Sequence, residues 1–143
     1  MDVKRVVARL VRKHETNDPF ALCRILDISI RYSDLGSIRG IYQYKFRKRL
    51  IHININLPDV IKRQVCAHEL GHAILHRKTN AVFLDSHTYL LTDRIETEAN
   101  RFAAELLIAD NALEPELLEG YVLSQIAATL EVSEQLLEYK IKY

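Results

Sequence analysis

Two histidines four residues apart, with a glutamate directly after the first, form the most distinctive chemical pattern in this sequence. The segment 68–72 reads HELGH and matches the HExxH pattern. In a helix, residues four apart lie on one face, separated by one turn. All other residues in 65–75 are apolar or glycine, so the polar side chains would form a narrow stripe on a buried helix. A metal ion satisfies two buried imidazoles at once, and Zn²⁺ is the expected ion.

The glutamate of this pattern points to hydrolytic chemistry. Glu69 lies about 100° around the helix from His68, beside the histidine face but offset from it. That is where a general base for a metal-activated water belongs. We therefore predict His68 and His72 as metal ligands and Glu69 as the catalytic base. His76, at the end of the same helix, is expected to be an outer partner or a helix cap rather than a ligand.

The third ligand is expected from a second helix, which carries two candidate glutamates. By the 100° rule Glu96 borders an apolar, alanine-rich stripe, whereas Glu98 falls on the opposite, polar face. We predict Glu96 as the ligand and Glu98 as a solvated residue paired with a neighbouring arginine. Asn100, one turn after Glu96, is placed to hydrogen-bond a ligand.

Two further observations concern the surroundings of this site. Gly71 lies in mid-helix, where glycine costs about 1 kcal/mol relative to alanine, and this predicts that another element approaches closely there. The segment 77–91 is expected to be a loop that joins the two site helices. Its His87 and Tyr89 are candidates for stabilising an oxyanion, and an ordinary surface loop is the alternative.

The remaining pattern predicts an α+β fold, in which a small antiparallel sheet packs on a helical body. The expected helices are 2–14, one beginning at Asp18-Pro19, 59–76, 94–108, 123–130 and 133–141, and the expected strands are 28–32, 41–46 and 50–55. We expect one domain, with N-terminal helices in 1–27, the sheet in 28–56, the metal-binding helices in 58–109 and C-terminal helices in 110–143.

Composition excludes several classes of protein. The chain has 143 residues, 48% of them hydrophobic and 27% charged, which is ordinary for a globular domain. It has no apolar run of membrane-spanning length, and charges throughout residues 1–15 argue against a secretory signal. Two cysteines cannot form a disulfide framework. We therefore expect a cytoplasmic protein with no membrane partner.

The charge pattern also argues against direct nucleic-acid binding. The net charge is only +1, and it divides into +9 over residues 1–80 and −8 over 81–143. We expect the two halves to neutralise each other, and a bipolar surface that steers a charged partner is the alternative. The segment 123–137 resembles a helix-turn-helix, but Glu134 and Glu138 in its second helix would repel phosphate. Packing helices or a protein-docking surface are expected there instead.

Taken together, these motifs resemble the ImmA/IrrE family of zinc metallo-endopeptidases. The resemblance rests on HELGHAILH at 68–76, ETEANRFAAELL at 96–107 and IHININ at 51–56, and it covers about residues 30–110. It implies a gluzincin-type site in a minimal zincin-like fold, with His68, His72 and Glu96 as zinc ligands. Family members are typically carried on mobile elements or phages, and several cleave a helix-turn-helix repressor to release gene expression.

The predicted function is therefore zinc-dependent hydrolysis of a peptide bond in a protein substrate. The resemblance implies that the substrate is a DNA-binding repressor of a mobile element or phage. We expect the substrate to lie extended along 50–55 and to add a strand to the sheet. The alternative is a non-proteolytic, zinc-stabilised regulator that binds and sequesters a repressor or a toxin.

Overall fold

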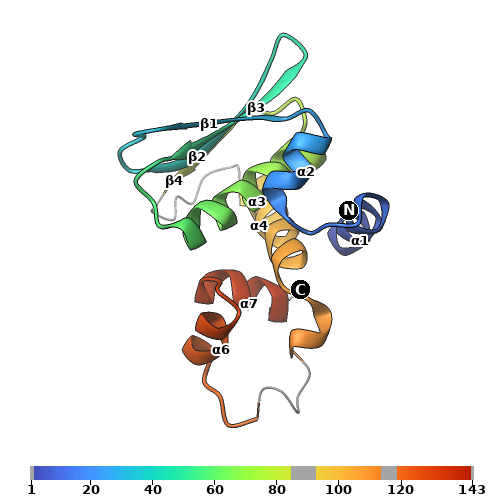
Figure 1. The fold of residues 1–143 in the computed structure, drawn as a ribbon, viewed down its shortest axis with the longest axis vertical. Coiled ribbons are helices and arrows are strands. Elements are labelled where there is room, and N and C mark those ends of the chain that lie inside the picture. Colours follow the sequence, from blue (N-terminus) through green and yellow to red (C-terminus); the bar gives the residue numbers. More distant parts are fainter. Residues whose placement is uncertain (1, 85–92, 114–118, 143) are drawn as a thin grey trace.

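The computed structural model describes residues 2–84, 93–113 and 119–142 (Figure 1). None of the helices in these ranges is long and apolar enough to cross a membrane. The elements in chain order are α1 (Val3–His14), α2 (Pro19–Ile25), β1 (Ser29–Ser33), β2 (Ile38–Lys45), β3 (Lys48–Asn54), α3 (Asp59–Leu75), β4 (Ala81–Leu84), α4 (Asp93–Leu107), the 3₁₀ turn η1 (Asp110–Leu113), α6 (Leu123–Thr129) and α7 (Glu134–Lys142).

Three helices begin at capping residues that are visible in the sequence. Asp2 accepts a hydrogen bond from the backbone N–H of the third residue of α1, at 3.1 Å. Asp18 accepts one from Phe20 at 3.0 Å, with Pro19 in the first position of α2. The Ser133 hydroxyl accepts one from Leu136 at the start of α7, at 3.1 Å. Each cap satisfies a backbone donor that the helix leaves without a partner.

The α+β class is confirmed, but the sheet is mixed rather than antiparallel. Its strand order is β1-β3-β2-β4, and β1 pairs with β3 in parallel, with Ile30 opposite Ile51. The other pairings, β2 with β3 and β2 with β4, are antiparallel. The side-chain amide of Asn54 donates to the carbonyls of Gly36 and Ile38, both at 3.0 Å, which ties the β1–β2 connection to the end of β3. β3 therefore lies between β1 and β2, and its Ile51 and Ile53 are fully buried.

The segment 77–91, predicted as a loop, contains the strand β4 at one edge of the sheet. Four residues are too few to show a clear alternating pattern, and β4 forms only by pairing with β2. The expectation of substrate along 50–55 is also wrong. β3 is paired on both sides, so it offers no free edge; the edge strands are β1 and β4.

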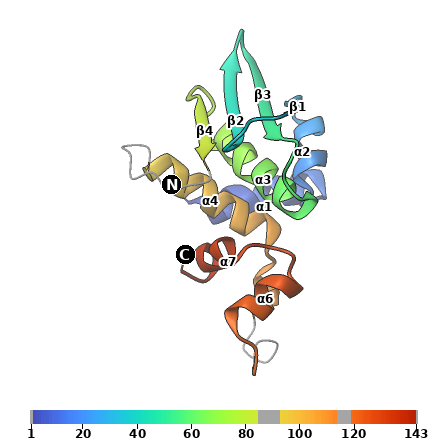
Figure 2. The same cartoon turned by 90° about the vertical axis from the view of Figure 1, so that its left-hand side faces the viewer.

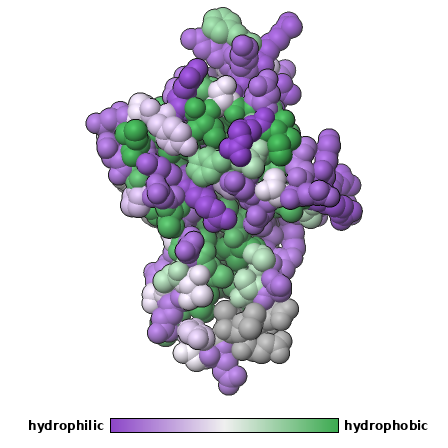
Figure 3. All heavy atoms as spheres, in the orientation of Figure 1, coloured by the Kyte–Doolittle hydropathy of each residue, from purple (hydrophilic) through white to green (hydrophobic). Residues whose placement is uncertain are grey.

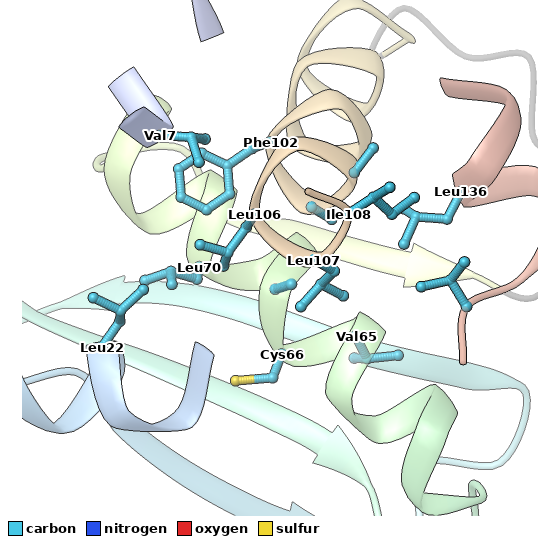
Figure 4. Close-up of a cluster of buried hydrophobic side chains, with 14 of the residues drawn as sticks. Val7, Leu22, Val65, Cys66, Leu70, Phe102, Leu106, Leu107, Ile108 and Leu136 are labelled. Carbon is cyan, nitrogen blue, oxygen red and sulfur yellow. The ribbon is translucent and has the colours of Figure 1, made fainter. Parts of the chain in front are cut away.

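The core lies where α3 packs between the sheet and α4 (Figures 1 and 2). Figure 4 shows Leu22 of α2, Leu70 of α3 and Phe102 of α4 among the buried side chains of this cluster. The predicted close approach at Gly71 is confirmed. A Cβ atom there would lie 3.0 Å from Cβ of Phe102 and 3.2 Å from Cα of Ala99. Gly71 therefore allows α4 to pack directly against the middle of α3.

The C-terminal helices form the lower part of the molecule in Figure 1, where α7 packs on α4. Figure 3 shows polar side chains over much of this face of the protein, with apolar side chains gathered near the place where the C-terminal helices meet the rest. Leu136 and Leu137 of α7 are buried at this junction, together with Leu107 and Ile108 at the end of α4. The C-terminal helices are thus joined to the body that carries the HExxH helix.

Candidate metal centre

The structure brings the three predicted ligands together between α3 and α4. Nε2 of His68 lies 2.9 Å from one carboxylate oxygen of Glu96, and Nε2 of His72 lies 2.9 Å from the other. The two Nε2 atoms are 3.2 Å apart. Ligand atoms of all three residues lie within 4.8 Å of one another. Both histidines are buried and the Glu96 side chain is 26% exposed, so the group is accessible from the glutamate side.

Each histidine is oriented through its other ring nitrogen. Nδ1 of His68 lies 2.8 Å from Oδ1 of Asn100, and the Asn100 amide group lies 3.3 Å from the hydroxyl of Tyr139. An amide oxygen only accepts, so Nδ1 of His68 is the donor in this contact, and Nε2 is the ring nitrogen turned toward Glu96. Nδ1 of His72 lies 3.0 Å from Nδ1 of His76. Such outer contacts fix the ring orientation and the tautomer of metal ligands.

The sequence predicted that His76 is an outer partner or a helix cap rather than a ligand. In the structure His76 contacts the candidate ligand His72 and does not join the ligand group. Its Nε2 lies 3.2 Å from Glu98, and this contact corrects the prediction for Glu98. The Glu98 side chain is only 14% exposed and lies between His76 and Arg94, whose Nε is 4.0 Å away. Glu98 is paired with an arginine as predicted. The prediction that Glu98 is solvated is wrong, because the end of α3 covers this face of α4.

Glu69 is the most unusual side chain of the site. It is fully buried, and neither carboxylate oxygen has a hydrogen-bond partner among the described residues. Burial, and then the neighbouring Glu96, raise the pKa of Glu69 well above its usual value. Gly40 of β2 allows the sheet to lie against this part of α3, because a Cβ there would be 2.6 Å from Cγ1 of Val65 and 3.3 Å from Cγ of Glu69. A buried carboxyl group without a partner is a typical signature of a functional site.

The protonation of the ligand group suits a cation. Burial works to raise the pKa of Glu96, but hydrogen bonds from His68 and His72 outweigh it and lower that pKa to about 2. Burial lowers the pKa of His72, although its hydrogen bond to Glu96 opposes the shift. At neutral pH the group thus contains an ionised carboxylate and a neutral imidazole, which are the forms that bind metals.

Phe83 belongs to the site, and the sequence did not reveal it. Its ring stacks on the His68 imidazole, with centroids 3.9 Å apart and planes inclined by 17°. Phe83 lies on β4, the strand that was predicted as a loop, so no periodic pattern placed it near the histidines. His87 and Tyr89, the candidate oxyanion stabilisers, lie outside the described residues.

Comparison with known proteins adds independent evidence. The sequence model of a peptidase family, described as the IrrE N-terminal-like domain, matches residues 23–142. The chain is 36% identical over 139 residues to a Bacillus phage phi105 protein named "Uncharacterized immunity region protein 2", covering 96% of this chain and 88% of that protein. It is 35% identical over 143 residues to "Metallopeptidase ImmA" of Bacillus subtilis (strain 168), covering 97% and 83% respectively.

Proposed function

Since the chain belongs to the ImmA/IrrE family of metallopeptidases, we propose that it is a zinc-dependent endopeptidase that cleaves a protein substrate. The observation that carries this proposal is the ligand group of His68, His72 and Glu96 with the partnerless carboxyl of Glu69 beside it. Metal binding alone would explain the three ligands. The buried carboxyl next to them is what favours catalysis.

The donor set fits zinc in particular. Two imidazole nitrogens and one carboxylate oxygen form the His₂Glu set of catalytic zinc sites, in which three protein ligands leave one position open. Zinc in such a set polarises a carbonyl group and makes water acidic enough to lose a proton near neutral pH. His68 and His72 would hold the ion through Nε2 and Glu96 through its carboxylate.

The other side chains of the site would handle protons and orientation. Glu69 would accept a proton from the attacking water on its carboxylate and then donate it to the nitrogen of the leaving amine. Its raised pKa favours holding the proton between the two steps. Asn100 and His76 would hold the two imidazoles in place through Nδ1. Removing such outer contacts typically weakens metal binding by about 10- to 100-fold.

The proposed binding site for the substrate backbone is the edge of β4 that faces away from β2. Among the described strands β4 pairs only with β2, so its other edge is available for an added strand. Phe83 of this strand contacts His68 directly, so a peptide along β4 would pass beside the ligand group. The contact between β4 and the site supports this edge over β1, the other edge of the sheet.

For the partner we propose a DNA-binding repressor of a phage or mobile element, cleaved in the cytoplasm by this chain acting as one domain, 1–143. The phage relative is named for an immunity region, and the family resemblance implies repressor cleavage. The near-neutral net charge supports recognition of a protein rather than direct binding of nucleic acid.

The decisive experiment compares the wild type with Glu69→Gln, using the repressor encoded next to this gene as substrate. Glutamine keeps the shape of the side chain and removes the base, so cleavage should fall by about 10²- to 10⁴-fold while both proteins bind one zinc per chain. Glu138→Gln, at an exposed position on α7, is the matched control and should cleave normally.

Two results would contradict the proposal. A wild-type protein that takes up no zinc on titration would rule out the metal centre. If the wild type and Glu69→Gln release the repressor from DNA equally well and neither produces fragments, the chain is instead a binding regulator.

A further inference from the structure

A small cavity lies beside His68, between α3, α4 and α7. Its volume is about 30 Å³, and its lining includes Arg39, Gln64, His68, Phe83, Asn100 and Tyr139. A water molecule needs about 10–15 Å³ by this measure. The cavity therefore has room for one or two waters, or for the end group of one side chain, but not for an aromatic ring.

Gln64 presents a hydrogen-bond donor that has no acceptor in this wall. The backbone N–H of Ser133 donates to Oε1 of Gln64 at 3.0 Å, which fixes the orientation of the amide group. Its Nε2 is buried and has no partner among the described residues, and Gln64 as a whole is only 9% exposed. Leaving a buried donor unsatisfied costs about 1–3 kcal/mol. An acceptor on a ligand that enters the cavity would satisfy this donor.

The polar groups around the cavity favour a negatively charged acceptor. Arg39 brings a guanidinium group to the lining, 5.7 Å from the centre of the Phe83 ring. Asn100 has its amide oxygen directed to His68 and its amide nitrogen to Tyr139. No aspartate or glutamate belongs to the described lining. A carboxylate would meet both a cation and a free amide donor there, and charge-assisted hydrogen bonds of this kind are the strong ones.

We propose that this cavity is a substrate subsite that takes the carboxylate of an Asp or Glu side chain, and that Gln64 is its specificity-determining residue. The inference rests on the proposed peptidase function and adds the chemical class of the residue next to the cleaved bond. His68 forms a wall of both the cavity and the ligand group. A side chain held in the cavity would therefore lie next to the ligand group.

This subsite also gives the C-terminal helices a role in the site. Ser133 lies at the start of α7 and orients Gln64, while Tyr139 of the same helix lines the cavity. The helix pair α6–α7 would thus complete the substrate pocket, and displacement of α7 would release the Gln64 amide from its fixed orientation.

The first test is cleavage of a randomised peptide library by the zinc-loaded full chain. The wild type should favour Asp or Glu at one position beside the cleaved bond by about 10- to 100-fold, the factor expected for a hydrogen bond to a charged group. Gln64→Leu keeps the side-chain size without the donor and should reduce this preference to less than about threefold. Gln64→Glu keeps an acceptor for Ser133 but places a negative charge in the cavity, and it should abolish the preference for Asp or Glu.

Failure of the subsite and failure of the peptidase give different results. Cleavage without an Asp or Glu preference, or a preference that survives Gln64→Leu, would overturn the subsite and leave the peptidase intact. If the library is not cleaved at all, the peptidase proposal fails, and a titration of the metal-free, ¹⁵N-labelled full chain with acetate decides the subsite. The Gln64 side-chain amide signals should shift saturably with acetate and not with methylammonium; unchanged signals with acetate would overturn the inference.

Discussion

Two buried clusters of charged side chains hold α4 in place, and they differ in where the cation comes from. At the far end of α4, Lys140 of α7 has a side chain only 5% exposed, and its Nζ lies 2.8 Å from Glu105 and also contacts Asp110. At the near end, Glu96 contacts two imidazoles, and Glu69 beside it has no hydrogen-bond partner among the described residues. The first cluster is neutralised within the described chain, whereas the second offers carboxylates to a cation from outside.

The pKa shifts of the two clusters express the same contrast. Burial alone would lower the pKa of Lys140, but its hydrogen bonds to Asp110 and Glu105 outweigh burial and raise it. Lys140 therefore stays charged and neutralises the carboxylates of its own cluster, which we call the closed cluster (Lys140, Glu105 and Asp110). Burial and the neighbouring Glu96 raise the pKa of Glu69, and its carboxylate oxygens have no hydrogen-bond partner among the described residues to oppose the shift. A buried carboxyl group paired with its own lysine joins helices, while one without a partner is poised to act on a ligand.

The strongest test of this contrast concerns the two glutamates of the first turns of α4. We expect Glu96→Ala to weaken zinc binding by more than about 100-fold, because it removes a direct ligand, and that exceeds the usual loss for an outer contact. Glu98→Ala should weaken it by no more than about 10-fold, because Glu98 acts only through His76. Competition with a chromophoric zinc chelator measures both affinities. A larger loss in Glu98→Ala would show that the ligand has been assigned to the wrong glutamate.

The second test removes the lysine from the closed cluster. Lys140→Met leaves Glu105 buried without its cation, and losing one partner of a buried ion pair costs about 3–5 kcal/mol. We expect about 3 kcal/mol, the lower end of that range, because the Asp110 side chain is 66% exposed and can be solvated. Urea unfolding of the metal-free protein measures the change, with Lys142→Met at an exposed position as the control. Zinc stoichiometry should remain one per chain; a loss of zinc would mean that the two clusters are not independent.

The sequence was sufficient for features that depend on one helix at a time. The HELGH segment and the apolar stripe of the second helix follow local periodicity, and both lie on helices as predicted. The helices predicted to begin at Asp18-Pro19 and to cover 133–141 are also present, as α2 and α7. The selection of Glu96 over Glu98 also relied on a single helix phase. That phase places Glu96 toward α3, where both histidines contact it.

The features that the sequence did not reveal all depend on contacts between distant segments. Glu98 is shielded because His76 of α3 lies over it, which a helical wheel of α4 alone cannot show. The parallel pairing of β1 with β3 and the short edge strand β4 arise from partners elsewhere in the sheet. The role of Gln64 was missed for the same reason, because its amide is oriented by Ser133, which is 69 residues away.

The smallest expected effect is the loss of folding free energy in acid that follows from protonation of Asp110 in the closed cluster. The hydrogen bond from Lys140 is the main cause that lowers the pKa of Asp110. Because the folded pKa lies below the unfolded value of about 3.9, this contribution is fully present above pH 4 or so and disappears as the pH falls through the folded pKa. Asp110 is largely exposed, so solvent screening should limit the contribution to less than about 1 kcal/mol.

Asp110→Asn removes this contribution together with that of Lys4, whose Nζ lies 3.4 Å from Asp110, because asparagine keeps the shape of the side chain and cannot ionise. The free energy of unfolding in urea should be lower in Asp110→Asn than in the wild type at pH 6, and the difference should shrink steadily below about pH 4 as the wild-type carboxylate takes up its proton. In the metal-free protein Glu96→Gln should show the same sign over a window that extends to about pH 2, the pKa of Glu96. A difference for Asp110→Asn that does not change with pH would mean that the ion pairs of Asp110 with Lys140 and Lys4 contribute nothing, and that Glu105 alone balances the buried lysine.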